Sequence, residues 1–172
     1  MLNKKEVKLG GPDDNIESLI NTENLILLGC GTSYHSCMYA KHFFKKLCNF
    51  NTINIHDGAD FETSDIPKNG KTLVIFVSQS GETKDLHRCV NIGKELDLFL
   101  IGVINVVDSM IAREVDCGVY LNAGREVGVA STKSFTNQVI ILSMLAIWFN
   151  QNIQKESYKR IKYINCLRNL PE

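Results

Sequence analysis

The chain has 172 residues, of which 44% are hydrophobic and 22% charged, so it can bury a core, and we expect one domain over residues 1–172. Nineteen basic and nineteen acidic residues cancel, which removes the electrostatic case for a nucleic-acid or membrane-surface partner. The most apolar run, residues 139–149, is shorter than the ~20 residues that a membrane-spanning helix needs.

The cysteine pattern argues against metal binding. The six cysteines form no C-x-x-C pair and have no histidine at zinc spacing, so we expect neither a metal site nor a cofactor. Several lie within apolar patterns, as buried free thiols do, which indicates a reducing cytoplasmic location. The N-terminal residues 1–5 are not followed by an apolar segment, so we expect no signal peptide.

The N-terminal part should be short and irregular before the first strand. Residues 1–12 form an irregular lead, because residues 10–12 read Gly-Gly-Pro, which breaks regular structure. Asp13 or Asp14 should then cap a short helix that has apolar residues at positions 16, 19 and 20.

Strands and helices alternate along the rest of the chain. Short apolar runs predict buried strands, and longer segments with apolar residues at helical spacing predict helices. Strands are expected at residues 25–28, 52–55, 73–77, 98–104 and 117–121. Helices are expected after residue 33, as a short turn of helix within 56–62, after residue 83, from a capping Ser109 to about Glu114, from Ser131 to Asn150, and at 153–172, where the tail is charged and amphipathic.

This alternation predicts an α/β fold, a parallel sheet with helices on both faces. In such sheets ligands bind outside the carboxyl ends of the strands, where the strand order reverses. The nearly uniform apolar character of residues 139–149 predicts a helix buried on several sides, against the sheet and either within this one domain or against a partner subunit.

The turn after the central strand is rich in hydroxyls. Residues 78–83 read Ser-Gln-Ser-Gly-Glu-Thr and join the run 73–77 to a helix. Free N–H groups at the helix start, with the hydroxyls of Ser78, Ser80 and Thr83, are suited to holding a phosphate. The alternative is that these residues only cap the helix while Glu82 suits its dipole.

The turn after the first strand could be mistaken for other sites. Gly29 and Gly31 suggest a dinucleotide fingerprint, but Tyr34 occupies the third glycine position, so that interpretation is rejected. Cys30 could be a nucleophile at a helix start, although a buried cysteine there is more often a small packing residue.

A third stretch completes a pattern. Residues 122–134 form a glycine-spaced loop that enters a helix capped by Ser131 or Thr132, with Lys133 solvated if it has no other role. Residues 30–33 (Cys-Gly-Thr-Ser), 78–83 and 126–133 (Glu-Val-Gly-Val-Ala-Ser-Thr-Lys), in this order, resemble the sugar isomerase (SIS) domain family. The resemblance is strongest to the first SIS domain of the glutamine–fructose-6-phosphate amidotransferases (glucosamine-6-phosphate synthases), and it covers about residues 9–171.

The resemblance implies a fold and a ligand. It implies a three-layer α/β/α, flavodoxin-like doubly wound fold with a five-stranded parallel sheet, and a homodimer built through the helices of these domains. It also implies a hexose phosphate, fructose-6-phosphate or glucose-6-phosphate, as ligand in the synthesis of glucosamine-6-phosphate and UDP-N-acetylglucosamine. By motif, the phosphate would be held by Ser33, Ser78, Ser80 and Thr83, and the rest of the sugar by Thr32, Gln79 and Val129, with Ser131 and Lys133 at the border.

The resemblance does not supply catalytic residues. In the family, isomerisation uses a Glu base, a ring-opening His and an imine-forming Lys that belong to a second sugar-binding domain and the tail beyond it, and the glutaminase half is separate. We therefore expect this chain to bind the sugar without turning it over alone, and assign no catalytic residue. Glu126 and Lys133 are the only nearby acid–base groups, and no sequence feature indicates a tuned pKa. Two alternatives stay open: a stand-alone regulatory module, and a single-domain isomerase that works as an oligomer.

Overall fold

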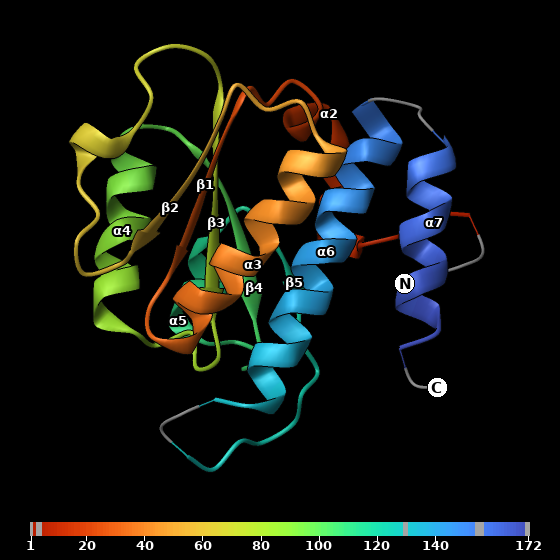
Figure 1. Ribbon diagram of the computed structural model, residues 1–172. Coiled ribbons are helices and arrows are strands. Elements are labelled where there is room, and N and C mark those ends of the chain that lie inside the picture. The colour runs from red at the N-terminus through yellow and green to blue at the C-terminus, as the bar shows by residue number, and fades with distance from the viewer. Residues whose placement is uncertain (1, 3–4, 129–130, 154–156, 171–172) are drawn as a thin grey trace.

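One all-parallel sheet forms the centre of the protein. The computed structural model describes residues 2, 5–128, 131–153 and 157–170. The strands follow the order β2-β1-β3-β4-β5, and all pair in parallel (Figure 1). The five-stranded parallel sheet of the prediction is therefore confirmed; its strands are β1 (Asn24–Gly29), β2 (Thr52–Asp57), β3 (Thr72–Ser78), β4 (Phe99–Ile104) and β5 (Cys117–Tyr120).

The central strands are apolar throughout because both of their faces are covered. Every residue of β1 and β3 is buried. Leu25 and Leu27 of β1 face one helical layer, whereas Ile26 and Leu28 join a separate apolar cluster on the opposite face. A strand buried on both sides has no polar face, which is why the sequence shows continuous rather than alternating apolar runs.

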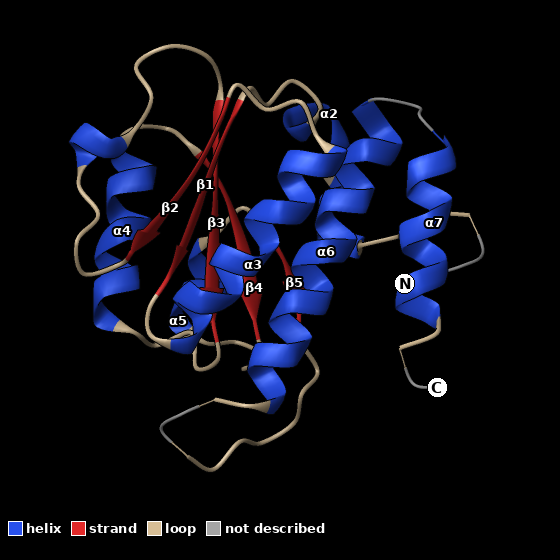
Figure 2. Ribbon diagram, in the orientation of Figure 1, coloured by secondary structure: helices blue, strands red, loops and turns tan. Residues whose placement is uncertain are grey.

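Helices cover both faces of the sheet, so the predicted three-layer arrangement is confirmed. Figure 2 shows α3 (Thr32–Leu47), α6 (Lys133–Ile153) and α7 (Ser157–Arg168) on one side, and α4 (Lys84–Glu95) with α5 (Met110–Glu114) on the other. Within α6 every residue from Ile141 to Asn150 is buried. The helix lies beside α3 and the sheet, and α7 packs against it through Ile164, Tyr163 and Leu167. The apolar side chains of α6 are therefore largely buried by contacts within this chain.

The N-terminal prediction was wrong in its boundaries. Helix α1 (Gly10–Asp14) begins inside the segment expected to be irregular, and α2 (Ile16–Leu19) follows Asn15. Asp13 lies within α1, where its carboxylate accepts hydrogen bonds from the Leu9 N–H (2.7 Å) and from Trp148 Nε1 (2.6 Å). The bond to Leu9 satisfies an N–H that precedes the helix, so a Gly-Gly-Pro start can still form a helix.

Two further boundaries differ from the prediction. His56 and Asp57 belong to β2, because they pair with Leu28 and Gly29 of β1, and the only helical turn nearby is the 3₁₀ helix η1 (Thr63–Asp65). At the other end α6 continues to Ile153, and α7 begins at Ser157, while residues 154–156, 171 and 172 lie outside the described part. Within the described ranges, none of the helices combines the length and the apolar character needed to cross a membrane.

Candidate functional site

The site lies where the strand order of the sheet reverses. From β1 the chain moves outward to β2 and then returns to β3 on the other side of β1. The loops that leave the carboxyl ends of β1 and β3 therefore diverge and open a crevice between them. Because both loops carry hydroxyl residues, the topology brings together two stretches that are more than 40 residues apart in the sequence.

These loops and the loop that precedes α6 line a cavity of about 160 Å³, which we call the inner cavity. Seven of the nine residues predicted for the sugar phosphate line it: Thr32, Ser33, Ser78, Gln79, Ser80, Thr83 and Ser131. Val129, the eighth, lies outside the described residues. Lys133, the ninth, does not line the cavity; its Nζ donates to the carbonyl oxygen of Arg125 (2.8 Å).

The hydroxyls of the central turn are placed to donate. The Gly81 N–H donates to Ser78 Oγ (2.9 Å), and the Glu82 N–H donates to Ser80 Oγ (3.2 Å). A hydroxyl that accepts from an N–H still has its own proton to give to another acceptor. Both hydroxyls can therefore accept from the turn and donate to a ligand at the same time.

The capping alternative does not describe this turn. Thr83 is the N-cap residue of α4, but its side chain makes no capping hydrogen bond. Glu82 does not serve α4 either, because its carboxylate accepts the N–H of Met110 (2.8 Å) at the start of α5. The prediction that Ser109 caps this helix is therefore corrected. Ser109 is the N-cap residue of α5, but its side chain makes no capping hydrogen bond, and Glu82 accepts the N–H of Met110 instead.

Glycine is required at two points of the crevice. Gly81 has φ +68°, and a Cβ there would overlap the side chain of Ser109. Gly31, just before α3, has φ +58° with open space around it, so only its backbone conformation favours glycine. The two positive-φ residues allow the loops after β1 and β3 to turn sharply into α3 and α4.

Gln138 is a site residue that the sequence analysis missed. It is fully buried on α6, and its Nε2 donates to Ser33 Oγ (2.9 Å). Ser33 thereby accepts a hydrogen bond in the same way as Ser78 and Ser80, which leaves its proton for the cavity. The partners are 105 residues apart, and a glutamine in an apolar helix carries no local signal of this contact.

Cys30 lines the inner cavity but is not set up as a nucleophile. Burial raises the pKa of its thiol to about 11, with the negative charge of Asp57 adding to the increase. A reactive cysteine needs the opposite shift, since the thiolate is the nucleophile. The interpretation of Cys30 as a packing residue is consistent with this environment.

The N-terminus of α6 is capped by Glu126 rather than by Ser131 or Thr132, which corrects the prediction. The Glu126 carboxylate accepts from Ser131 Oγ (2.6 Å) and from the backbone N–H groups of Thr132 (2.7 Å) and Lys133 (2.9 Å). The hydrogen bond from Ser131 is the largest cause that lowers the pKa of Glu126, and the backbone donors add to it. These hydrogen bonds to the Glu126 carboxylate hold the loop that follows β5 to the N-terminus of α6.

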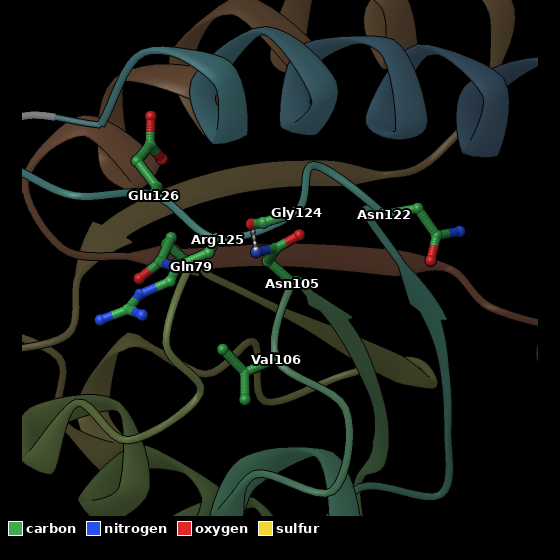
Figure 3. A pocket seen from close by; sticks show the side chains of 7 residues that line it. All are labelled: Gln79, Asn105, Val106, Asn122, Gly124, Arg125 and Glu126. Atoms are coloured by element: carbon green, nitrogen blue, oxygen red, sulfur yellow. Dashed lines mark hydrogen bonds between the residues drawn. The ribbon is translucent and has the colours of Figure 1, made fainter.

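A second cavity adjoins the first. This outer cavity has a volume of about 450 Å³ and lies at the carboxyl ends of β3, β4 and β5. Figure 3 shows Gln79 and Arg125 among the residues that line it, with Asn105 and Val106 below the loop that carries Gly124. Gln79 lines both cavities and so forms their common wall.

The same fold and related sequences occur in known proteins. The solved C-terminal domain of glucosamine-fructose-6-phosphate aminotransferase from Francisella tularensis superposes with a TM-score of 0.86 at 29% identity, over 98% of this chain and 47% of that one. A probable glutamine–fructose-6-phosphate aminotransferase (isomerizing) of Acanthamoeba polyphaga mimivirus is 49% identical over 93% of this chain. The human glutamine–fructose-6-phosphate aminotransferase (isomerizing) 2 is 37% identical over 96% of it.

These relatives are much longer than the match. The chain spans 26% of the mimivirus protein and 24% of the human one. The family model of the SIS domain matches residues 18–148, which include all three loops that surround the inner cavity. This chain is therefore a member of the SIS domain family, with relatives among the glutamine–fructose-6-phosphate aminotransferases.

Proposed function

We propose that this chain is the hexose-phosphate-binding domain of an enzyme of the glucosamine-6-phosphate synthase type. Its ligand would be fructose-6-phosphate or glucose-6-phosphate, with the phosphate in the inner cavity. The observation that carries the proposal is that Ser33, Ser78 and Ser80 converge on one cavity, each accepting a hydrogen bond that leaves its proton to donate. Thr83 adds a fourth hydroxyl, and the first turn of α4 adds N–H groups.

The names of the relatives support the choice of ligand. Two of them are named as isomerizing glutamine–fructose-6-phosphate aminotransferases. The role proposed for this chain is to supply the sugar-phosphate site for isomerisation in cytoplasmic amino-sugar synthesis, on the route to UDP-N-acetylglucosamine. Thr32, Gln79, Val129, Ser131 and Lys133 would border the remainder of the sugar.

We further propose that the chain does not turn the sugar over alone. The Cys30 thiol is protonated at neutral pH, because its pKa is raised to about 11. Glu126 is already engaged by several donors, and Lys133 Nζ is bonded to a carbonyl oxygen. For the cysteine of the inner cavity and for these two charged groups near it, the environments favour binding over proton transfer.

A homodimer through the helical layer is part of the same proposal. An apolar hollow of about 300 Å³ lies on that side, between Phe43 of α3, Ile147 of α6 and Leu167 of α7. Apolar surface of this kind supports self-association, since exposed apolar patches commonly mark interaction sites.

Calorimetric titration with fructose-6-phosphate and glucose-6-phosphate tests the proposed ligand. Ser78→Ala should weaken binding by about 0.5–1.5 kcal/mol for one neutral hydrogen bond, and by more if the acceptor is a charged phosphate oxygen. Ser64→Ala, on the exposed turn η1, is the matched control and should leave the affinity unchanged. The absence of any heat with both sugars at millimolar concentration would reject the proposal.

A further inference from the structure

Glu82 places a negative charge within the turn that is proposed to hold a phosphate. Its neighbours Ser80 and Thr83 line the inner cavity, whereas Glu82 is exposed and is not among the described residues of that lining. A carboxylate close to a bound phosphate weakens phosphate binding by charge repulsion. The Glu82 carboxylate is therefore unsuited to contact the ligand, and what it does contact is helix α5.

The first turn of α5 is hydrogen-bonded to this turn at two points. The Met110 N–H donates to Glu82 Oε1 (2.8 Å), and the Ile111 N–H donates to the Gly81 carbonyl oxygen (3.0 Å). Both donors are among the N–H groups that a helix leaves free at its start. Gly81 also packs closely against Ser109, because a Cβ at this glycine would overlap the serine side chain. The start of α5 therefore fixes two successive residues of the turn.

The bond to the Gly81 carbonyl oxygen sets the direction of the next N–H group. The Gly81 C=O and the Glu82 N–H belong to one planar trans peptide unit, so they point in opposite directions. Because this carbonyl is directed to Ile111, the Glu82 N–H points away from α5, and it donates to Ser80 Oγ (3.2 Å). Accepting that hydrogen bond leaves the Ser80 proton for a ligand. Helix α5 thus acts on a phosphate-binding hydroxyl through a single peptide unit.

The position of α5 depends on its contacts, because a helix of five residues is too short to be stable by itself. At its far end the Glu114 carboxylate accepts from Lys94 Nζ and lies within hydrogen-bond distance of His87 Nε2, both at 3.0 Å. Between the two ends, Ile111 is fully buried in the apolar cluster on the α4 side of the sheet. Helix α5 is therefore bound to α4 at one end and to the turn at the other, where Glu82 accepts its first N–H.

We propose that Glu82 is a positioning residue for the bound phosphate. By accepting the Met110 N–H it keeps the start of α5 against the turn, and α5 orients the peptide unit that donates to Ser80. Its carboxylate then strengthens phosphate binding in spite of its negative charge. This inference rests on the proposed function, because it concerns the same phosphate in the inner cavity.

Calorimetric titration of the full chain with fructose-6-phosphate and with inorganic phosphate tests this role. Glu82→Ala removes the acceptor and should weaken the binding of both ligands about three- to tenfold, in the range of one lost hydrogen bond. Glu82→Gln keeps an oxygen that can accept the Met110 N–H, so it should restore binding. Glu95→Ala removes the same charge from the exposed end of α4 and should change neither affinity.

Met110→Pro removes the same hydrogen bond from the donor side. Proline has no N–H and is tolerated at the first position of a helix, and Ser109 already has the extended backbone (φ −63°, ψ 162°) that suits a residue before proline. This variant keeps the Glu82 charge, yet it should weaken both ligands as Glu82→Ala does. The losses should not add in the double variant, because both substitutions remove one and the same bond.

The outcomes distinguish this inference from the proposed function. If the unmodified chain binds fructose-6-phosphate but Glu82→Ala binds it as tightly or more tightly, the inference is overturned and the proposed function stands. A lower melting temperature of Glu82→Ala with an unchanged affinity has the same meaning, because Glu82 would then only stabilise α5. Equal losses for Glu82→Gln and Glu82→Ala would also overturn it, since the charge would then matter rather than the accepted bond. If the unmodified chain binds neither ligand, both proposals fail together.

Discussion

At the scale of single residues, the hydrogen bonds that Ser33, Ser78 and Ser80 accept matter as much as the hydroxyls themselves. Ser78 and Ser80 accept from N–H groups of their own turn, two or three residues away. Ser33 accepts from Gln138, which belongs to a different helix. An amide NH₂ group can only donate, so the Ser33 hydroxyl cannot give its proton to Gln138 Nε2. That proton can instead be donated to a ligand in the inner cavity, which Ser33 lines.

Gln138→Leu should therefore weaken sugar-phosphate binding through Ser33. We expect a loss of roughly 0.5–1.5 kcal/mol in the binding free energy, as for one neutral hydrogen bond. The measurement is a double-mutant cycle of titrations with Gln138→Leu, Ser33→Ala and the double variant. If Gln138 acts through Ser33, the double variant should bind no more weakly than Ser33→Ala alone.

A buried amide at the far end of α6 provides the control for this cycle. Asn150 is also buried, and its Nδ2 donates to the Leu47 carbonyl oxygen (2.8 Å). Asn150→Leu should lower the free energy of unfolding but leave the affinity for the sugar phosphate unchanged. Fully additive losses for Gln138→Leu and Ser33→Ala would show that Gln138 does not act through Ser33.

At the scale of elements, acidic residues from elsewhere in the chain cap two of the helices. Glu82 accepts the first N–H of α5, and Glu126 accepts three backbone N–H groups at the start of α6, those of residues 132–134. A carboxylate at this position also interacts favourably with the positive end of the helix dipole. The capping bonds thus tie the loops that follow β3 and β5 to neighbouring helices.

The Glu126 cap predicts a specific pH dependence. Its pKa is lowered in the folded state from the ordinary value of 4.5, chiefly by the Ser131 hydroxyl. A depressed folded-state pKa contributes stability that is complete above the unfolded-state value and is lost as the pH falls below it. Glu126→Gln should therefore lower the melting temperature at pH 7, and this difference from the unmodified chain should shrink as the pH is lowered from 4.5.

Thermal unfolding of both proteins from pH 7 to pH 3 measures this effect. Glu17→Gln, in α2, is a control for removing one carboxylate from a helix that does not border the site. A melting-temperature difference that stayed constant across this pH range would contradict the capping role of Glu126.

At the scale of the whole molecule, burial falls from the centre of the sheet toward the β2 edge. All residues of β1 and β3 are buried, whereas all residues of β2 are only half-buried. The crevice opens beside β1 and β3, so the loops of the site leave the most protected strands. A rigid sheet centre is a suitable base for loops that must hold side chains in fixed positions.

Native-state hydrogen exchange should report this gradient. The slowest amides of β1 and β3 should exchange only through global unfolding, and the slowest amides of β2 should exchange faster through local opening. Exchange rates followed by NMR at increasing denaturant measure the two classes. Identical opening free energies for the slowest amides of all three strands would mean that the sheet opens as one unit.

Much of the fold could be predicted because its signals are local. Strands β1 and β3 are short apolar runs between polar turns, and their boundaries differ from the prediction by one residue at each end. The helix starts were predicted less well. Ser109 and Ser131 have the residue type of an N-cap, but the N–H groups there are taken by Glu82 and Glu126. The type of residue at a helix start does not show which acceptor from outside the helix will bind its free N–H groups.

The sequence by itself determined the five apolar strands, the alternation with helices and the hydroxyl-rich turns, because each depends on neighbouring residues. Only the tertiary structure decided which hydroxyls share a cavity, that Gln138 donates to Ser33, and that Gln79 lines a second cavity as well. These features depend on the strand order 2-1-3-4-5 and on side chains that meet across as many as 105 residues. Contacts at that separation arise from packing, which no local pattern records.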